Sequence, residues 1–292
     1  MKSELYNVSS DNKNYVWLTS SFFYDIKKWH LVLSEIEAFL NDGINNEYIH
    51  FYVSLKYSPN YNIQFAVLCE NEEIMDIMGV KFHEYFTKFK DKNRPENYEV
   101  DVRGIGLPYP SNTYQLGVYQ ILFNEKENAF YIAQQYFSKL IFLGLKTEAF
   151  TEEDTHTLAV YAVITVGKIM FNFNKFVASN LFEKLQKAYF AHGFQIKENF
   201  PEAFNEINNL SMQLLATSDI EKEEPWLADW FRFCKNELKE NLTNLSDSVQ
   251  TERKMKEIYI NKINHITNQL GIHQEAKETL LSLVNCTLIT NT

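Results

Sequence analysis

The stretch YIHFYVSLKYSPNYNIQFAVL, residues 48–68, decides the expected fold because apolar and polar side chains alternate along both of its halves. Apolar residues occupy every second position from Ile49 to Tyr57 and again from Ile63 to Val67. Alternation with period two is typical of β-strands, and the Ser-Pro-Asn sequence between the halves favours a turn. The stretch therefore predicts a β-hairpin with one apolar face toward a core. The opposite, polar face carries Lys56, Asn62 and Gln64.

Periodicity outside the hairpin predicts a mixed architecture. Two segments rich in aromatic and β-branched residues, 15–24 and 98–107, are expected to be strands. Apolar residues at spacings of three and four predict helices at 27–41, 72–89, 127–145, 151–173, 175–190, 202–216, 225–242, 250–270 and 274–288. Residues 108–119 contain two prolines and a glycine, which predict an irregular segment.

These elements indicate an α+β protein. Residues 1–123 are expected to form a mixed sheet covered by helices. Residues 124–292 are expected to be mostly α-helical and to pack with the first part as one domain. With 292 residues, of which 45% are hydrophobic, the chain can bury a large core.

Composition excludes several classes of function. The net charge is −10 and only four of the 28 basic residues are arginine, so the basic stripe that nucleic-acid binding needs is missing. A negative field suits a cationic or neutral peptide partner. The apolar run 158–171 is shorter than a bilayer span and contains Lys168, which predicts a buried helix and no membrane span. The polar N-terminus and three widely spaced cysteines lead us to expect a cytoplasmic protein.

Motifs for metal or cofactor chemistry are missing from the sequence. We find no glycine-rich phosphate loop, no HExxH and no nucleophile elbow. The seven histidines are scattered, without the spacing of metal ligands. We therefore expect neither a metal nor a cofactor.

Four segments resemble the C-terminal domain of class I lantibiotic dehydratases, which also occurs as a stand-alone thiopeptide-type bacteriocin biosynthesis protein. Leu55-Lys56-Tyr57 resembles the family's Ile-Arg-Tyr strand end, and residues 62–66 resemble its His-Ile-Arg-Leu-Arg strand. Residues 109–118, YPSNTYQLGV, resemble a Tyr-Pro segment that closes in Arg-Tyr-Gly-Gly. Residues 281–286 echo the family's His-Met-x-x-Asn-Arg end. The order of elements is similar over essentially the whole chain.

The resemblance implies a function on a ribosomally synthesised precursor peptide. Such domains eliminate glutamate from glutamylated Ser or Thr, while stand-alone relatives join two dehydroalanines into a pyridine ring. It implies two partners, the precursor peptide and a separate glutamylating dehydratase chain. It implies catalytic roles for Lys56, Gln64, Arg103, Gln115 and Asn285, and substrate-binding roles for Tyr57, Asn62, Tyr109 and Tyr114.

The chain departs from the family at the residues that carry the chemistry. Gln64, Ala66 and Gln115 stand where the family has arginine, and leucine stands at the histidine. An amide cannot replace a bidentate guanidinium, and each lost charged contact removes about 2 kcal/mol or more of stabilisation. Lys56 and Arg103 are the cations that could compensate. Three readings stay open: a lyase or cycloaddition catalyst, a non-catalytic member that binds the precursor or a modification enzyme, and an unrelated α+β protein.

Overall fold

The fold begins with a four-stranded antiparallel sheet. The computed structural model describes residues 14–44, 48–57, 61–92, 112–121, 128–189, 200–243, 245 and 247–291. The strands are β1 (Val16–Phe23), β2 (His50–Lys56), β3 (Asn62–Cys69) and β4 (Thr113–Leu116), in the order β2-β3-β1-β4. β2 and β3 form the predicted hairpin, with Lys56 opposite Asn62 and His50 opposite Leu68. Its turn, at residues 58–60, lies outside the described residues.

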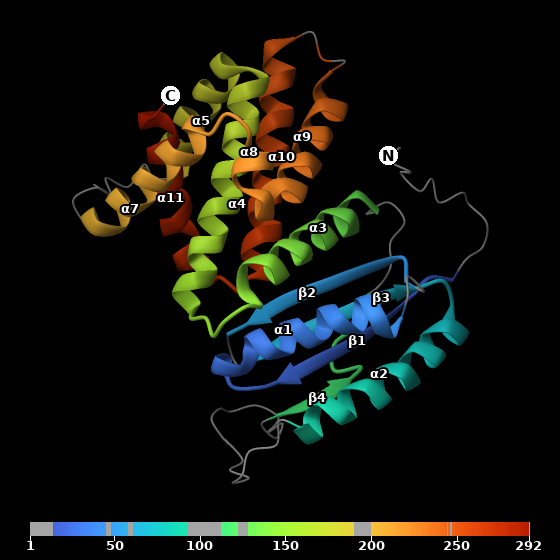
Figure 1. The fold of residues 1–292 in the computed structure, drawn as a ribbon. Coiled ribbons are helices and arrows are strands. Elements are labelled where there is room, and N and C mark those ends of the chain that lie inside the picture. The colour runs from blue at the N-terminus through green and yellow to red at the C-terminus, as the bar shows by residue number, and fades with distance from the viewer. Residues whose placement is uncertain are drawn as a thin grey trace.

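Two helical segments cover one face of the sheet (Figure 1). The first is a continuous run of η1 (Ile26–Lys28), α1 (Trp29–Ala38) and the π-helical turn η2 (Phe39–Gly43). The second is α2 (Glu72–Lys92). Phe22 of β1 packs edge-on against Phe86 of α2 at 4.8 Å between ring centroids, and Phe65 of β3 stacks on Phe82 at 6.2 Å. Aromatic burial therefore fixes this face as the core side of the sheet.

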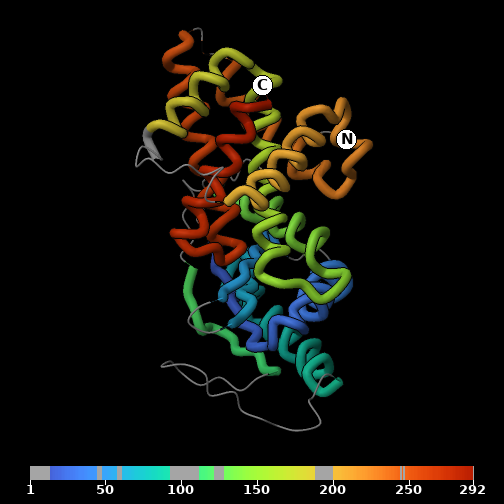
Figure 2. Tube along the Cα trace, turned by 90° about the vertical axis from the view of Figure 1, so that its left-hand side faces the viewer, coloured from blue at the N-terminus to red at the C-terminus, as the bar shows by residue number. Residues whose placement is uncertain are grey.

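From residue 128 on, the described residues are mostly helical, which confirms the α+β class. α3 (Asn128–Leu145) lies beside β2, and the other helices stack above it (Figures 1 and 2). They are α4 (Glu152–Phe173), α5 (Lys175–Tyr189), α7 (Pro201–Ala216), α8 (Ile220–Glu223), η4 (Pro225–Leu227), α9 (Ala228–Leu242), α10 (Ser248–Gln269) and α11 (Gln274–Thr290).

α4 is the core helix of the helical part. Thr151 and Asp154 form the capping box that its first residues predict. In the part of the chain that the structure describes, α4 is the one helix long and apolar enough to cross a membrane, but 72% of that apolar window is buried inside the protein. Lys168 lies in this helix with 5% exposure, and its Nζ donates to Leu214 O at 2.7 Å, Leu215 O at 3.1 Å and Thr217 O. The lysine thus caps the C-terminal end of α7.

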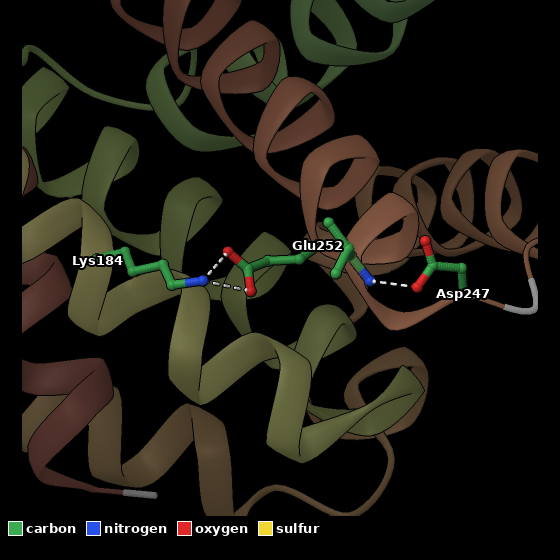
Figure 3. A network of polar contacts seen from close by, with 4 residues as sticks. Lys184, Asp247 and Glu252 are labelled. Atoms are coloured by element: carbon green, nitrogen blue, oxygen red, sulfur yellow. Dashed lines mark hydrogen bonds and ion pairs between the residues drawn. The ribbon is translucent and has the colours of Figure 1, made fainter.

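α10 spans the height of the helical part. Near its N-terminal end, Glu252 accepts two hydrogen bonds from Lys184 of α5, at 2.6 and 2.8 Å (Figure 3). Asp247 caps the helix by accepting from the Val249 backbone N–H at 3.1 Å (Figure 3). The C-terminal end of α10 reaches the hairpin, where Gln269 Nε2 donates to Val53 O of β2 at 3.0 Å.

α3 and α10 together cover the outer edge of β2 at Val53. The Val53 N–H donates to Ser138 Oγ at 2.9 Å, and Gln269 Nε2 lies 3.0 Å from the same oxygen. Both polar backbone groups of Val53 are therefore paired with side chains instead of with another strand. An edge strand without such partners would be free to pair with a further chain.

Two predicted segments need comment, the irregular segment at 108–119 and the strand at 98–107. Residues 108–119 were predicted to be irregular, but Thr113–Leu116 form the edge strand β4, which pairs with β1. A strand of four residues followed by Gly117 is too short for its period-two alternation to be recognised in the sequence. The strand predicted at 98–107 lies outside the described residues.

Candidate functional site

A row of polar side chains crosses the sheet on the face opposite α1 and α2. The strand register places Ser54, Gln64, Ser21 and Gln115 directly beside one another, one from each strand. We call these four residues the polar row. Ser54 Oγ lies 3.4 Å from Gln64 Oε1, which is long for a hydrogen bond. The two serines form the floor, since they are 0% and 1% exposed, while Gln64 is partly exposed and Gln115 is exposed.

The other half of the same face is apolar. Trp17, Tyr52 and Leu68 lie there, covered by Tyr131 of α3, whose ring centroid is 5.5 Å from that of Trp17. Tyr119, which follows β4, packs against this cluster, and its carbonyl accepts from Thr19 Oγ1 at 2.6 Å. Burial raises the pKa of both Tyr52 and Tyr119, so these phenols stay protonated. One half of this face is therefore apolar and covered by α3, and the other half is polar.

Lys56 extends the polar half at the end of β2. It stands opposite Asn62, and its Nζ donates to Asn268 O of α10 at 3.3 Å. Burial lowers the pKa of the Lys56 ammonium from its usual value, because removal from water disfavours the charged form.

A small hollow opens beside Lys56, between the hairpin and the turn that joins α10 to α11. It is open to solvent, has a volume of about 190 Å³ and is lined by Lys56, Tyr57, Thr267, Asn268, Gly271, Ile272 and His273. Gly271 has a φ of +67°, and a Cβ there would lie 2.4 Å from Leu55 O. Only glycine lets the turn approach the hairpin this closely.

Four of the predicted site residues share one face of the sheet. Lys56, Asn62, Gln64 and Gln115 lie on the polar half. Tyr114 lies on the opposite face, where its hydroxyl contacts His83 Nδ1 at 2.9 Å and its ring packs on Phe82. Neighbouring residues of a strand point to opposite faces, so Tyr114 and Gln115 cannot line the same site.

Tyr57 lies between the core and the hollow. Its ring centroid is 5.1 Å from that of Trp29, and its hydroxyl donates to Thr155 Oγ1 at 3.4 Å. The same residue also lines the hollow.

Asn285 lies away from the polar row. It is 3% exposed on α11, and its Oδ1 accepts from Tyr259 of α10 at 2.8 Å. Twelve residues separate it from His273 at the hollow, which is about 18 Å along a helix. The structure therefore does not gather Asn285 with the four sheet residues. Arg103 and Tyr109 lie outside the described residues.

Sequence reasoning missed the contributions of Ser21, Asn268 and His273. Ser21 ends a Thr-Ser-Ser run within an otherwise apolar strand. This polar interruption is the sequence pattern that could have indicated a polar surface on β1. Asn268 and His273 flank the glycine break between two helices. Their place beside Lys56 follows from a contact across 212 residues, which no local pattern predicts.

The site offers hydrogen-bonding groups and few charges. Its amides and hydroxyls suit the backbone of a peptide, which needs both donors and acceptors. Lys56 supplies a cation, and His273 supplies an imidazole. Within the described ranges, no three His, Cys, Asp or Glu side chains lie close enough together to hold a metal ion.

Comparisons with known proteins identify the fold. No family model matches the chain, and neither does any curated protein. Among solved structures, the pyridine synthase TbtD from thiomuracin biosynthesis is 12% identical with a TM-score of 0.56, covering 93% of this chain and 97% of that one. The tRNA-dependent lantibiotic dehydratase MibB from Microbispora sp. 107891 is 10% identical with a TM-score of 0.57, covering 93% of this chain and 28% of that one.

These two matches confirm, at the level of fold, the resemblance that the hairpin predicts. The chain has the fold shared by the thiomuracin pyridine synthase and by just over a quarter of the lantibiotic dehydratase.

Proposed function

We propose that this protein acts in the maturation of a ribosomally synthesised peptide in bacteriocin biosynthesis, and that the precursor peptide binds at the polar row. The observation that carries the proposal is the extent of the match to the pyridine synthase, which spans 93% of this chain and 97% of that one. A protein of this fold is thus a pyridine synthase of thiomuracin biosynthesis. The amides and hydroxyls of the polar row support the same conclusion, because they match the needs of a peptide backbone.

The reaction we favour is glutamate elimination, or a related reaction on dehydroamino acids. In an elimination, a base takes the α-proton of a glutamylated Ser or Thr, a Cα=Cβ bond forms, and the Cβ–O bond breaks to release glutamate. The departing carboxylate needs a cation, and Lys56 is the cation at the polar half. His273 lines the same hollow and is our candidate for the base.

A second candidate function is binding without catalysis. It is favoured by the two glutamines of the polar row, Gln64 and Gln115, which stand where the family resemblance implies arginine. Neutral amides can hold a peptide but stabilise a leaving carboxylate poorly. In this role the protein would present the precursor to a separate modification enzyme, such as a glutamylating dehydratase chain. We place either activity in the cytoplasm.

Mass spectrometry of two peptide substrates separates these functions. We would incubate the protein with the precursor peptide encoded beside its gene, once glutamylated and once carrying two dehydroalanines. Loss of glutamate supports the lyase, and ring formation supports the cycloaddition catalyst. Unchanged peptides that still bind, measured by fluorescence anisotropy, support the binding protein. If the protein neither converts nor binds either peptide, a role in peptide maturation is contradicted.

A paired substitution tests where the peptide binds. Gln64→Ala combined with Gln115→Ala removes both amides of the polar row, and we expect peptide affinity to fall about tenfold, at about 0.5–1 kcal/mol for each hydrogen-bonding group. Gln213→Ala, an exposed amide on α7, is the matched control and should leave affinity unchanged. Equal affinities for both variants would place the peptide elsewhere.

A further inference from the structure

We propose that the hollow between β2 and the α10–α11 turn binds a single carboxylate through the Lys56 ammonium. Resting on the function proposed above, we further infer that this carboxylate belongs to the peptide that lies on the polar row. The proposal names the anion that the Lys56 ammonium, the cation already placed at the polar half, would hold while the peptide is bound.

The hollow joins segments that are remote in sequence. Lys56 is the last residue of β2, while Asn268 and His273 come from the turn region more than 200 residues later. Gly271 makes the contact possible, since any side chain there would collide with Leu55 O. Backbone packing at Gly271 therefore brings the α10–α11 turn against the end of β2, where the hollow lies.

Lys56 is under-bonded for a half-buried cation. An ammonium has three N–H donors, but the hydrogen bond of Lys56 is a 3.3 Å contact to the neutral carbonyl of Asn268. Over the ranges described, no carboxylate lies within ion-pair distance of its Nζ, whereas Lys262 pairs with Glu237 and Lys146 pairs with Glu37. Lys56 is partly buried, so its ammonium loses part of its hydration, and an anion entering the hollow would offset that loss.

The surroundings favour a carboxylate over a phosphate. Phosphate sites usually collect several cations, often arginines, around a doubly charged group. Here one ammonium is accompanied by an amide and an imidazole, in a protein whose net charge is −10. A hollow of about 190 Å³ accepts a carboxylate with a few methylene groups. A single negative charge therefore matches the site best.

The position of the hollow connects it to the peptide. Strands lie about 4.8 Å apart, so the polar row measures about 14 Å, the length of about four extended residues. Lys56 follows Ser54 on the same face of β2, at the end of the row next to the hollow. A peptide along the row would thus place an acidic side chain, or its C-terminus, beside Lys56.

Protection of Lys56 from chemical acetylation tests the site without any peptide. We would measure by mass spectrometry the acetylation rate of each lysine with N-acetylglutamate α-amide, with its neutral glutamine analogue, and with inorganic phosphate. At a carboxylate concentration of about twice its Kd, we expect the modification of Lys56 to slow about threefold. The modification of exposed Lys175 should be unaffected. No protection, equal protection by the neutral analogue, or stronger protection by phosphate would each overturn the proposal.

Variants then connect the site to the peptide. We would compare precursor peptides that carry glutamate or glutamine at each position in turn, binding to wild type, Lys56→Met, Lys56→Arg and the control Lys175→Met. Lys56→Met should abolish a preference of about tenfold for the acidic peptide, and Lys56→Arg should retain part of it. Protection by the small carboxylate without any peptide binding would count against the proposed function alone. Peptide binding without carboxylate protection would count against the hollow alone.

Discussion

Lys168 is buried and Lys56 is partly buried, but their ammonium groups have different hydrogen-bond partners. Lys168, in the helical part, directs its ammonium at three carbonyls where α7 ends. Lys56, where the sheet meets the helices, has one long contact to a carbonyl and borders a hollow. Burial lowers the pKa of both ammonium groups, so burial alone does not distinguish them. The bonding partners do, because a saturated cation serves structure whereas an under-bonded one is available to a ligand.

Lys168→Met should give the largest effect on stability. The substitution leaves three carbonyls at the end of α7 without their donor, and we expect unfolding to become easier by about 4 kcal/mol. Urea denaturation followed by circular dichroism measures this change, with the exposed Lys175→Met as the control. A loss of less than about 1 kcal/mol would break the comparison, because Lys168 would then be as dispensable as a surface lysine.

The pH dependence of stability tests whether the helical part tolerates a protonated His265. Burial, aided by the nearby Lys262, lowers the pKa of His265 to about 4. The unfolded chain binds this proton near pH 6.5, so stability from this group is full above pH 6.5 and is lost as the pH falls toward 4. We expect a loss of about 2–3 kcal/mol over this window, measured by urea titrations at several pH values. His265→Gln should flatten that dependence, and an unchanged slope would refute the assignment.

Gln269→Leu should have an intermediate effect. Its Nε2 lies 3.0–3.1 Å from Val53 O, Gln134 O and Ser138 Oγ, joining the sheet to the helical part. We expect the variant to lose about 2 kcal/mol of stability, since buried acceptors lose their donor. Faster hydrogen exchange along β2 would locate the damage at the junction. Gln250→Leu, at the exposed start of α10, is the control, and equal losses in both variants would contradict the role of Gln269.

Lys56→Met should give the smallest change in stability. Its single weak hydrogen bond contributes little, so we expect the free energy of unfolding to change by less than about 0.5 kcal/mol. Thermal and urea unfolding measure the difference. A large destabilisation would show that Lys56 supports the fold as Lys168 does, and the contrast between the two lysines would disappear.

Much of the fold could be predicted because local patterns determine it. Alternation along residues 48–68 gave the hairpin, and the capping box at Thr151 gave the start of α4. The site was predicted only in part. The period-two pattern put Lys56, Asn62 and Gln64 on one face, but His273 reaches them through packing across more than 200 residues. Asn285 was expected near them from a faint end motif, whereas burial against Tyr259 decides its position.

The seal on the outer edge of β2 has a consequence for how copies of this protein behave toward one another. Because the N–H and C=O groups of Val53 are engaged by Ser138 and Gln269, the hairpin cannot extend its hydrogen-bond ladder at that point into a neighbouring molecule. Opening the seal would expose a strand rich in aromatic and β-branched residues. Two polar side chains from helices far apart in the sequence thus block strand addition at the middle of this edge.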